Sequence, residues 1–168
     1  LDYHNTHQGR LEILVDVMGR VNYGKWVGKD QKGLIGPVLI DDKPVKGWDH
    51  IAFPLDDLST LRFDNTVIKG AVIKGAMVKD PAFYRGEFTL SERGYTFLDM
   101  RGWGKGYVWV NGHNLGRYWS VGPQRSLFVP APWLKTGINE VIVFDLQEDA
   151  GRALSGVQNP IWDIASNV

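Results

Sequence analysis

Residues 106–119, GYVWVNGHNLGRYW, combine the side-chain types that bind sugars. A sugar-binding surface typically offers an aromatic ring to the apolar face of a pyranose and amide groups to its hydroxyls. Strand alternation would place Tyr107, Trp109 and Asn111 on one face, and Val108 and Val110 on the other. The carbohydrate-binding candidates of this stretch are Trp109, Asn111, His113, Asn114 and Trp119.

The same stretch also has the pattern of a β-hairpin. Aromatic residues are most often packing residues, so Trp109 would fill the core. Asn111 and Gly112 tolerate the positive φ that a tight hairpin turn requires. The pattern favours this packing interpretation, and the sugar-binding interpretation stays open beside it.

Paired carboxylates would indicate a glycoside hydrolase, because such enzymes place two Asp or Glu residues about 5 to 9.5 Å apart across the sugar. The candidates are Asp16, Asp41, Asp42, Asp49, Asp56, Asp57, Glu87, Asp99 and Glu140. Most of them adjoin turn residues, where short acidic side chains cap the backbone. Asp99 could point inward, but we expect it to pair with Arg101, which is close in the sequence, or with a residue of another strand. No catalytic pair stands out.

Motifs for metals, nucleophiles and phosphates are also weak. His4 and His7 lie in DYHNTHQG, which has no helical pattern and suggests no third ligand. The G-x-S-x-G motif of serine hydrolases does not occur. The glycines of GWGKG (102–106) lack the spacing of a Walker motif and fit a tight turn between strands. The residues therefore predict no catalytic group, no metal and no cofactor in this chain.

Composition bounds the class of protein. The 168 residues suit one ordinary domain, and 43% hydrophobic residues provide material for a core. The 19 basic and 19 acidic side chains balance, which argues against a nucleic-acid partner. No apolar run is long enough to span a membrane, so we expect no membrane partner. Cysteine is absent, and because the chain opens on Leu1 we expect it to have been cut from something longer.

Strand signals dominate the chain, and turn residues separate them. The expected strands are 11–17, 33–41, 48–55, 82–90, 94–102, 106–112, 124–131 and 139–146. No long segment has helical periodicity. This pattern predicts an all-β sandwich or barrel with little helix. The repeated IKG unit within 67–80 interrupts the rhythm and suits an extended connector, and Trp162 in the C-terminal tail is expected to dock on the sandwich.

Several segments together resemble the C-terminal β-domains of family 35 glycoside hydrolases, the β-galactosidases. The resemblance rests on LEILVDVMGRVNYGK (11–25), DQKGLIGPV (30–38), GWDHIAFPL (47–55), AFYRGEFTL (82–90) and the long block 97–146. These segments cover most of the chain in the order of the family. The long block is the most specific of them.

The resemblance implies a jelly-roll β-sandwich of galactose-binding-like fold, downstream of a catalytic barrel that lies outside this chain and holds the two Glu residues of a retaining enzyme. Residues 1–25 would form the last strand and exit loop of a preceding β-domain, and residues 26–168 the jelly-roll domain with its tail. The loop GRVNYG (19–24) would approach the barrel mouth, so Tyr23 would help bind the galactoside. A secreted or periplasmic location is also implied.

Two main functions follow for this chain, beside a purely structural or oligomerisation role that a measurement of its mass in solution would test. The first is a non-catalytic β-sandwich portion of a β-galactosidase, which supports the upstream barrel and lines its mouth. The alternative is an independent carbohydrate-binding module for galactose-type sugars, with the five hairpin residues named above as its platform. Binding of galactose or lactose to the chain alone would distinguish them.

Overall fold

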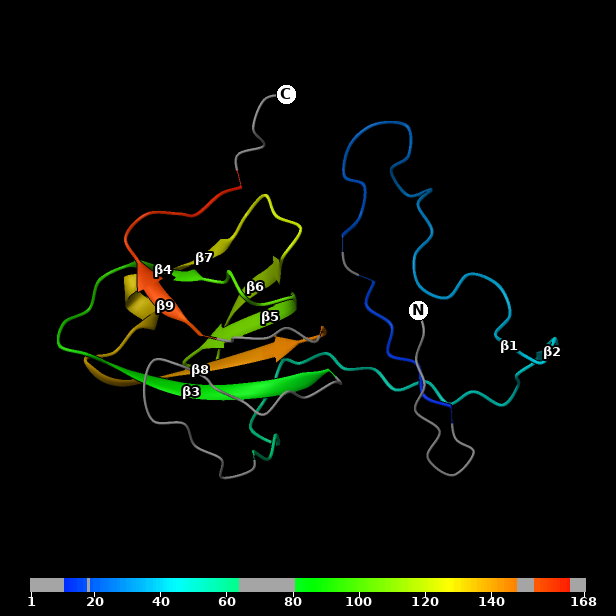
Figure 1. Ribbon diagram of the computed structural model, residues 1–168, viewed down its shortest axis with the longest axis horizontal. Coiled ribbons are helices and arrows are strands. Elements are labelled where there is room, and N and C mark those ends of the chain that lie inside the picture. The colour runs from blue at the N-terminus through cyan, green and yellow to red at the C-terminus, as the bar shows by residue number, and fades with distance from the viewer. Residues whose placement is uncertain (1–10, 18, 64–80, 148–152, 164–168) are drawn as a thin grey trace. The chain divides into compact units, whose positions relative to one another are not determined.

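The computed structural model describes residues 11–17, 19–63, 81–147 and 153–163. The chain divides into two compact units, Leu1–Phe53 and Pro54–Val168 (Figure 1). His4, His7 and the IKG repeat lie outside the described residues. Within these ranges no helix is long and apolar enough to cross a membrane.

The second unit is a sandwich of two antiparallel sheets, as Figure 1 shows. The larger sheet has the order β3 (Ala82–Leu90), β8 (Gly137–Asp145), β5 (Lys105–Val110), β6 (His113–Trp119). The smaller sheet has the order β7 (Ser126–Val129), β4 (Thr96–Asp99), β9 (Ser155–Val157). The 3-10 turn η1 (Ala131–Trp133) is the only helical segment within the described residues. The predicted all-β jelly-roll sandwich is confirmed.

The core lies between the two sheets and is built by strand alternation. Val108, Val110 and Val143 are fully buried on the inner face of the larger sheet. Leu98, Leu127 and Val129 face them from the smaller sheet; the other buried members of the cluster are Tyr84, Met100, Trp103, Tyr118, Leu134, Val141 and Leu154. Aliphatic side chains of this kind stabilise the fold by removing their surface from water.

Trp103 anchors the aromatic end of this core. Its ring meets Tyr84 and Tyr118 edge-on, at centroid distances of 5.5 Å and 6.3 Å. Its indole N–H donates to the carbonyl of Ala153 at 3.0 Å, which ties the segment before β9 to the sandwich. A buried tryptophan is stable here because its one polar atom has a partner.

Trp109 is buried, as the packing interpretation requires, but outside the cluster between the sheets. The predicted alternation is confirmed for β5, because Val108 and Val110 point inward and Trp109 faces outward. Trp109 lies beside Phe83 and Tyr107 on that outer face, at 6.5 Å and 6.2 Å between ring centroids. The larger sheet therefore carries apolar side chains on both faces.

The predicted hairpin turn is confirmed between β5 and β6. Asn111 has φ 49° and Gly112 has φ 81°. A two-residue hairpin turn of type I′ needs positive φ at both central residues. The register then shifts between Val108 and Trp109, so that Leu115 is the extra residue of a bulge in β6. Trp119, the last residue of β6, lies opposite Lys105 at the end of the hairpin farthest from the turn.

The first unit has less regular structure than the sequence predicts. Its short hairpin pairs β1 (Leu39–Ile40) with β2 (Lys43–Pro44), and Asp41 and Asp42 form the turn with positive φ. The prediction of strands at 11–17 and 48–55 is wrong. Neither range forms a β-ladder, and the large apolar side chains of both are mostly exposed. The residue types favour strand, but a strand is stable only when paired, and no described residue pairs with either range.

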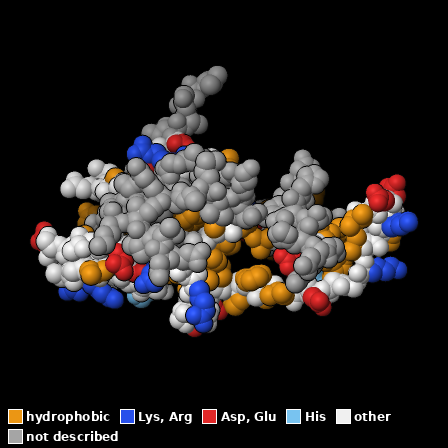
Figure 2. All heavy atoms as spheres, turned by 60° about the horizontal axis from the view of Figure 1, so that its bottom comes forward, with side chains coloured by type: hydrophobic (Ala, Val, Ile, Leu, Met, Phe, Trp, Pro, Cys, Tyr) orange, Lys and Arg blue, Asp and Glu red, His pale blue; other side chains and the backbone are white. Residues whose placement is uncertain are grey.

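Hydrophobic side chains reach the surface in several places on the face shown in Figure 2, where Lys, Arg, Asp and Glu side chains lie in scattered groups among the described residues. The exposed hydrophobic residues include Leu14, Ile35 and Ile51 in the first unit and Tyr95, Phe128 and Ile138 in the second.

Gly106 tests how tightly β5 and β8 approach each other. A Cβ added at Gly106 would lie 1.8 Å from the carbonyl oxygen of Phe144 and 2.9 Å from the hydroxyl of Tyr118. We expect Gly106→Ala to lower the free energy of unfolding by about 3 kcal/mol or more, because backbone must move to accommodate it. Gly94→Ala is the matched control, since its added Cβ meets nothing within 4 Å. Urea unfolding of both variants measures the difference, and equal stabilities would contradict the close approach.

Candidate functional site

The five candidate residues of the hairpin lie in different places. His113 stacks on Trp133 at 4.7 Å between ring centroids with 16° between the planes. The side-chain oxygen of Asn114 accepts the backbone N–H of Gly116 at 2.7 Å, inside the bulge. Trp109 is buried on the outer face of the sheet. In the ladder Asn114 lies opposite Trp109, whereas His113 lies opposite the inward-facing Val110.

Trp119 occupies a separate, basic surface at the far end of β6. It is 38% exposed, and two cations lie over its ring: Lys105 Nζ at 4.7 Å and the Arg117 guanidinium at 5.7 Å from the centroid. Such contacts stabilise a partly exposed tryptophan. A sugar role for the five residues stays a prediction; Trp119 lies opposite Lys105, at the other end of the hairpin from Asn111.

Asn111 has a structural role that the sequence interpretation did not include. Its amide nitrogen donates to the carbonyl of Trp133 at 2.7 Å and to Oδ1 of Asn139 at 2.9 Å. Its amide oxygen accepts the backbone N–H of Glu140 at 3.0 Å. Both ends of the amide group are therefore engaged within the fold.

Asn139 completes this network while fully buried. Its oxygen also accepts the N–H of Lys135 at 2.8 Å, and its nitrogen donates to the carbonyls of Lys135 and Gly137 at 2.8 Å and 3.0 Å. A buried amide is tolerated because all of its polar atoms have partners. The two asparagines join the β5–β6 turn to the loop that leads into β8.

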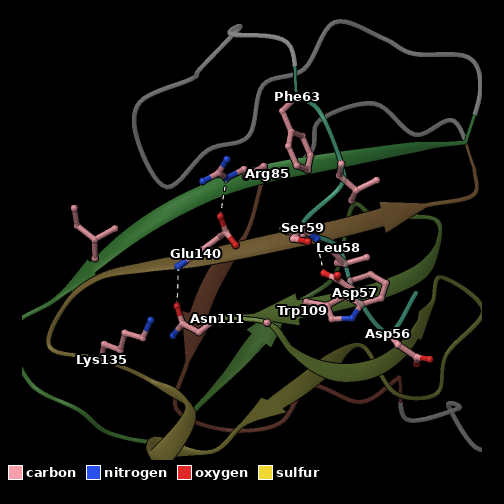
Figure 3. A pocket seen from close by; sticks show the side chains of 14 residues that line it. Asp56, Asp57, Leu58, Ser59, Phe63, Arg85, Trp109, Asn111, Lys135 and Glu140 are labelled. Carbon is pink, nitrogen blue, oxygen red and sulfur yellow. Dashed lines mark hydrogen bonds and ion pairs between the residues drawn. The ribbon is translucent and has the colours of Figure 1, made fainter. Parts of the chain in front are cut away.

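A cavity of about 660 Å³ lies on the outer face of the larger sheet (Figure 3). The strands β3, β5 and β8 and the segment 56–63 contribute its walls. The lining residues are Asp56, Asp57, Leu58, Ser59, Leu61, Phe63, Arg85, Trp109, Asn111, Gly112, Lys135, Ile138, Glu140 and Ile142. All of them belong to the second unit, so the cavity is a feature of the sandwich itself.

An ion pair crosses one side of this cavity. Arg85 on β3 forms an ion pair with Glu140 on β8, with 2.7 Å between Nε and Oε2, and the side chains are 48% and 34% exposed. The two residues are diagonal neighbours, since Arg85 is opposite Ile142 and Glu140 is opposite Glu87. The ring of Phe63 lies 5.8 Å from the guanidinium carbon, so an aromatic face flanks the ion pair (Figure 3).

Two of the candidate carboxylates have the structural roles that the sequence predicts. Asp57 accepts the backbone N–H of Ser59 at 2.8 Å, which holds the pKa of this carboxyl below its usual range. Asp99 forms a bidentate pair with Arg101, with contacts of 2.7 to 3.1 Å, and this hydrogen bonding lowers the pKa of Asp99 and raises that of Arg101. Both stay ionised and engaged, as a turn cap and an ion pair.

Asp145 is a buried carboxylate that the sequence interpretation missed. It is 1% exposed at the end of β8, and burial raises its pKa above the ordinary value. The backbone N–H groups of Gln147, Gly104 and Lys105 donate to it at 2.9, 3.3 and 3.4 Å, and partly oppose that rise. Its place at the end of the aliphatic run VIVF is the signal that could have predicted its burial.

Tyr23 stands on an exposed loop of the first unit. Its side chain is 90% exposed, and Gly19 and Gly24 on either side have φ 79° and 88°. Asp30 fixes the base of this loop: its side chain accepts the N–H of Val21 at 3.3 Å, and its carbonyl accepts a guanidinium N–H of Arg20 at 3.1 Å. The phenol of Tyr23 is thus presented to solvent on a braced turn.

No group of three or more metal-binding side chains is found in the ranges that the structure describes. Arg85, Lys135 and Phe63, which shape the cavity, were not singled out from the sequence. Arg85 and Glu87 share one face of β3, and two charges on the same face of a strand are a signal that could have indicated an outer surface. The pairing of Arg85 with Glu140 depends on sheet order, which the sequence pattern does not encode.

Two family models match the chain in succession. The "Beta-galactosidase, first all-beta domain" model matches residues 1–56, and the "Beta-galactosidase, galactose-binding domain" model matches residues 81–139. The first match runs beyond residue 25, where the sequence interpretation places a domain boundary; that boundary stays a prediction. The all-beta description of the first model agrees with a chain that has little helix in its described residues.

Relatives among known proteins resemble almost the whole chain. β-Galactosidase-1-like protein 2 of Homo sapiens is 40% identical over 161 residues, which is 89% of this chain and 23% of the relative. β-Galactosidase 17 of Arabidopsis thaliana is 40% identical over 176 residues, covering 97% of this chain and 25% of the relative. A β-galactosidase of Xanthomonas manihotis is 42% identical over 122 residues, which is 73% of this chain and 19% of the relative. The chain thus spans about a quarter of the length of the first two of these relatives.

The buried carboxyl of Asp145 predicts a pH dependence of stability. Because folding raises its pKa above 3.8, its protonated form is favoured in the folded state. The stability of the native chain relative to Asp145→Asn should be greatest below pH 3.8, and should decline as the pH rises through the folded pKa. Urea unfolding between pH 3 and pH 7 measures this difference.

Asp99→Asn provides a control of opposite sign. Arg101 lowers the pKa of Asp99, so the contribution of this carboxylate is present above pH 3.8 and is lost as the pH falls through its folded pKa. If both variants change with pH in the same direction, burial does not govern the protonation of Asp145.

Proposed function

Since the chain belongs to the β-galactosidase family and consists of non-catalytic β-domains, we propose that its parent protein removes terminal β-linked galactose with a catalytic domain that lies outside residues 1–168. The observation that carries this proposal is the succession of two β-galactosidase domain matches along one chain, at 1–56 and 81–139. The names of the relatives support the same activity for the parent.

The mechanism of the parent then follows from its reaction class. A retaining glycosidase uses one carboxyl group as nucleophile and a second as acid and base, in a double displacement. Among the candidate carboxylates of this chain, Asp57 forms a turn cap and Asp99 forms an ion pair. We therefore place both reacting groups in an upstream barrel, and give these β-domains the role of supporting that barrel.

The exposed loop 19–30 is the part of this chain that we place near the reacting sugar. A tyrosine hydroxyl can donate to and accept from sugar hydroxyls, and Tyr23 presents its hydroxyl on a turn braced by Asp30. Because the side chain is 90% exposed in the chain by itself, it contributes little to the stability of its own unit. Its role is therefore to position substrate in the parent.

The division of labour between the domains can be tested with the chain alone. Residues 1–168 should release no product from a chromogenic β-galactoside, whereas the parent protein should hydrolyse it. A parent without this activity would contradict the proposed function. Hydrolysis by the isolated chain, retained after removal of any contaminating enzyme, would show that the reacting groups lie within these β-domains instead.

Tyr23 gives a second test in the parent enzyme. We expect Tyr23→Phe to reduce kcat/KM about three- to tenfold through the loss of one hydrogen bond, and Tyr23→Ala to reduce it further. The melting temperature should not change, since the side chain is exposed. Tyr95→Phe, at a tyrosine that is 66% exposed in the other unit, is the matched control. Unaltered kinetics of Tyr23→Ala would remove Tyr23 from the substrate site.

A further inference from the structure

The charges that line the outer-face cavity nearly balance. Arg85 and Lys135 are basic, and Asp56, Asp57 and Glu140 are acidic. A strongly charged ligand would therefore meet like charges on one side of the cavity, whatever its sign. A ligand that is polar but uncharged avoids this repulsion and can still use the hydrogen-bonding capacity of the lining.

Arg85 can supply hydrogen-bond donors to such a ligand. Its Nε lies 2.7 Å from Oε2 of Glu140 in an ion pair, and among the described residues none accepts a hydrogen bond from its two terminal nitrogens. The guanidinium group holds these donors in a fixed planar fork, and the carboxylate beside it adds an acceptor. Adjacent hydroxyls on a sugar ring present the matching pairs of acceptors and donors.

Part of the cavity wall is apolar. Phe63 flanks the guanidinium group of Arg85 (Figure 3). Leu58 from the segment 56–63 and Trp109 and Ile142 from the sheet also line the cavity. A pyranose has an apolar C–H face in addition to its hydroxyl edge, and it suits a site with one aromatic and aliphatic side and one charged side. The cavity of about 660 Å³ falls within the range of small-molecule sites, about 300 to 1,000 Å³.

We propose that this cavity is an accessory binding site for a neutral saccharide of one or two rings, with Arg85 and Glu140 bound to its hydroxyls and Phe63 against its apolar face. The site belongs to the sandwich and acts independently of the hydrolytic centre of the parent. The choice of a β-galactoside as the first probe rests on the proposed function; the site itself rests on the cavity and its lining.

The experiment measures sugar binding to residues 1–168, which contain no proposed hydrolytic centre. Lactose and cellobiose are titrated separately into the chain, and binding is followed by ligand-observed NMR. We expect saturable binding of at least one disaccharide, weakened about tenfold or more by Arg85→Gln, because charge-assisted hydrogen bonds are lost. Arg85→Lys keeps a cation beside Glu140 without the fork, and should bind with intermediate affinity.

Two control variants test whether the sugar binds at this cavity rather than elsewhere on the sandwich. Arg101→Gln removes an arginine–carboxylate pair of the same 2.7 Å length beside the smaller sheet, and should leave the affinity unchanged. Trp119→Ala removes the exposed tryptophan at the far end of β6, and should also leave it unchanged. Circular dichroism confirms folding of each variant; if Arg85→Gln does not fold, Arg85→Lys provides the comparison.

The results that would overturn the proposal are equally specific. These are the absence of saturable binding for both disaccharides, binding by the Arg85 variants equal to that of the native chain, or loss of binding in Trp119→Ala alone. The last result would place the sugar on the hairpin instead. Hydrolysis by the parent is a separate measurement, so the proposed function and this site can fail independently.

Discussion

The paired amides of Asn111 and Asn139 determine how the parts of the sandwich meet. Asn111 donates its backbone N–H to the carbonyl of Glu140 and accepts the N–H of Glu140 through its side chain, so it continues the β5–β8 ladder beyond the last residue of β5. Asn139 holds the loop at Lys135 and Gly137 against the same turn. Asn139 is fully buried and Asn111 is half-buried, and the amide atoms of both have hydrogen-bond partners, which makes the register costly to change. Glu140 therefore points outward toward Arg85.

The larger sheet carries apolar side chains on both faces, and this explains the unusual composition of its strands. Valines fill the inner face, whereas Phe83, Trp109 and Phe144 occupy the outer face, where Phe83 and Phe144 stack at 4.4 Å. An antiparallel sheet with one face in water would alternate apolar and polar residues. The strand GYVWV has few polar positions because the outer face is also partly covered, and the segment 56–63 contributes to that covering.

Local pattern predicted the second unit better than the first. The strand at 82–90 begins and ends at the predicted residues, and the turn at Asn111 and Gly112 has the predicted φ values, because alternation and turn chemistry are local properties. The range 11–17 has the same aliphatic character as β8 but lacks a described partner strand, and pairing is not a local property. The same limit hid the cavity, since Arg85 and Glu140 become neighbours only when β3 pairs with β8.

The sheet order also determines when the sandwich can be assembled. Within the described residues β3 pairs with β8 alone, so that Ala82 meets Asp145 and Leu90 meets Gly137, while β5 and β6 form a local hairpin between them in the chain. During synthesis the hairpin can close early, but β3 has no ladder partner until residues 137–145 have been made. A ribosome-bound chain that stops before β8 would expose both β3 and the side of β5 that β8 covers. Completion of β8 is thus the event that converts a hairpin and a loose strand into a sheet.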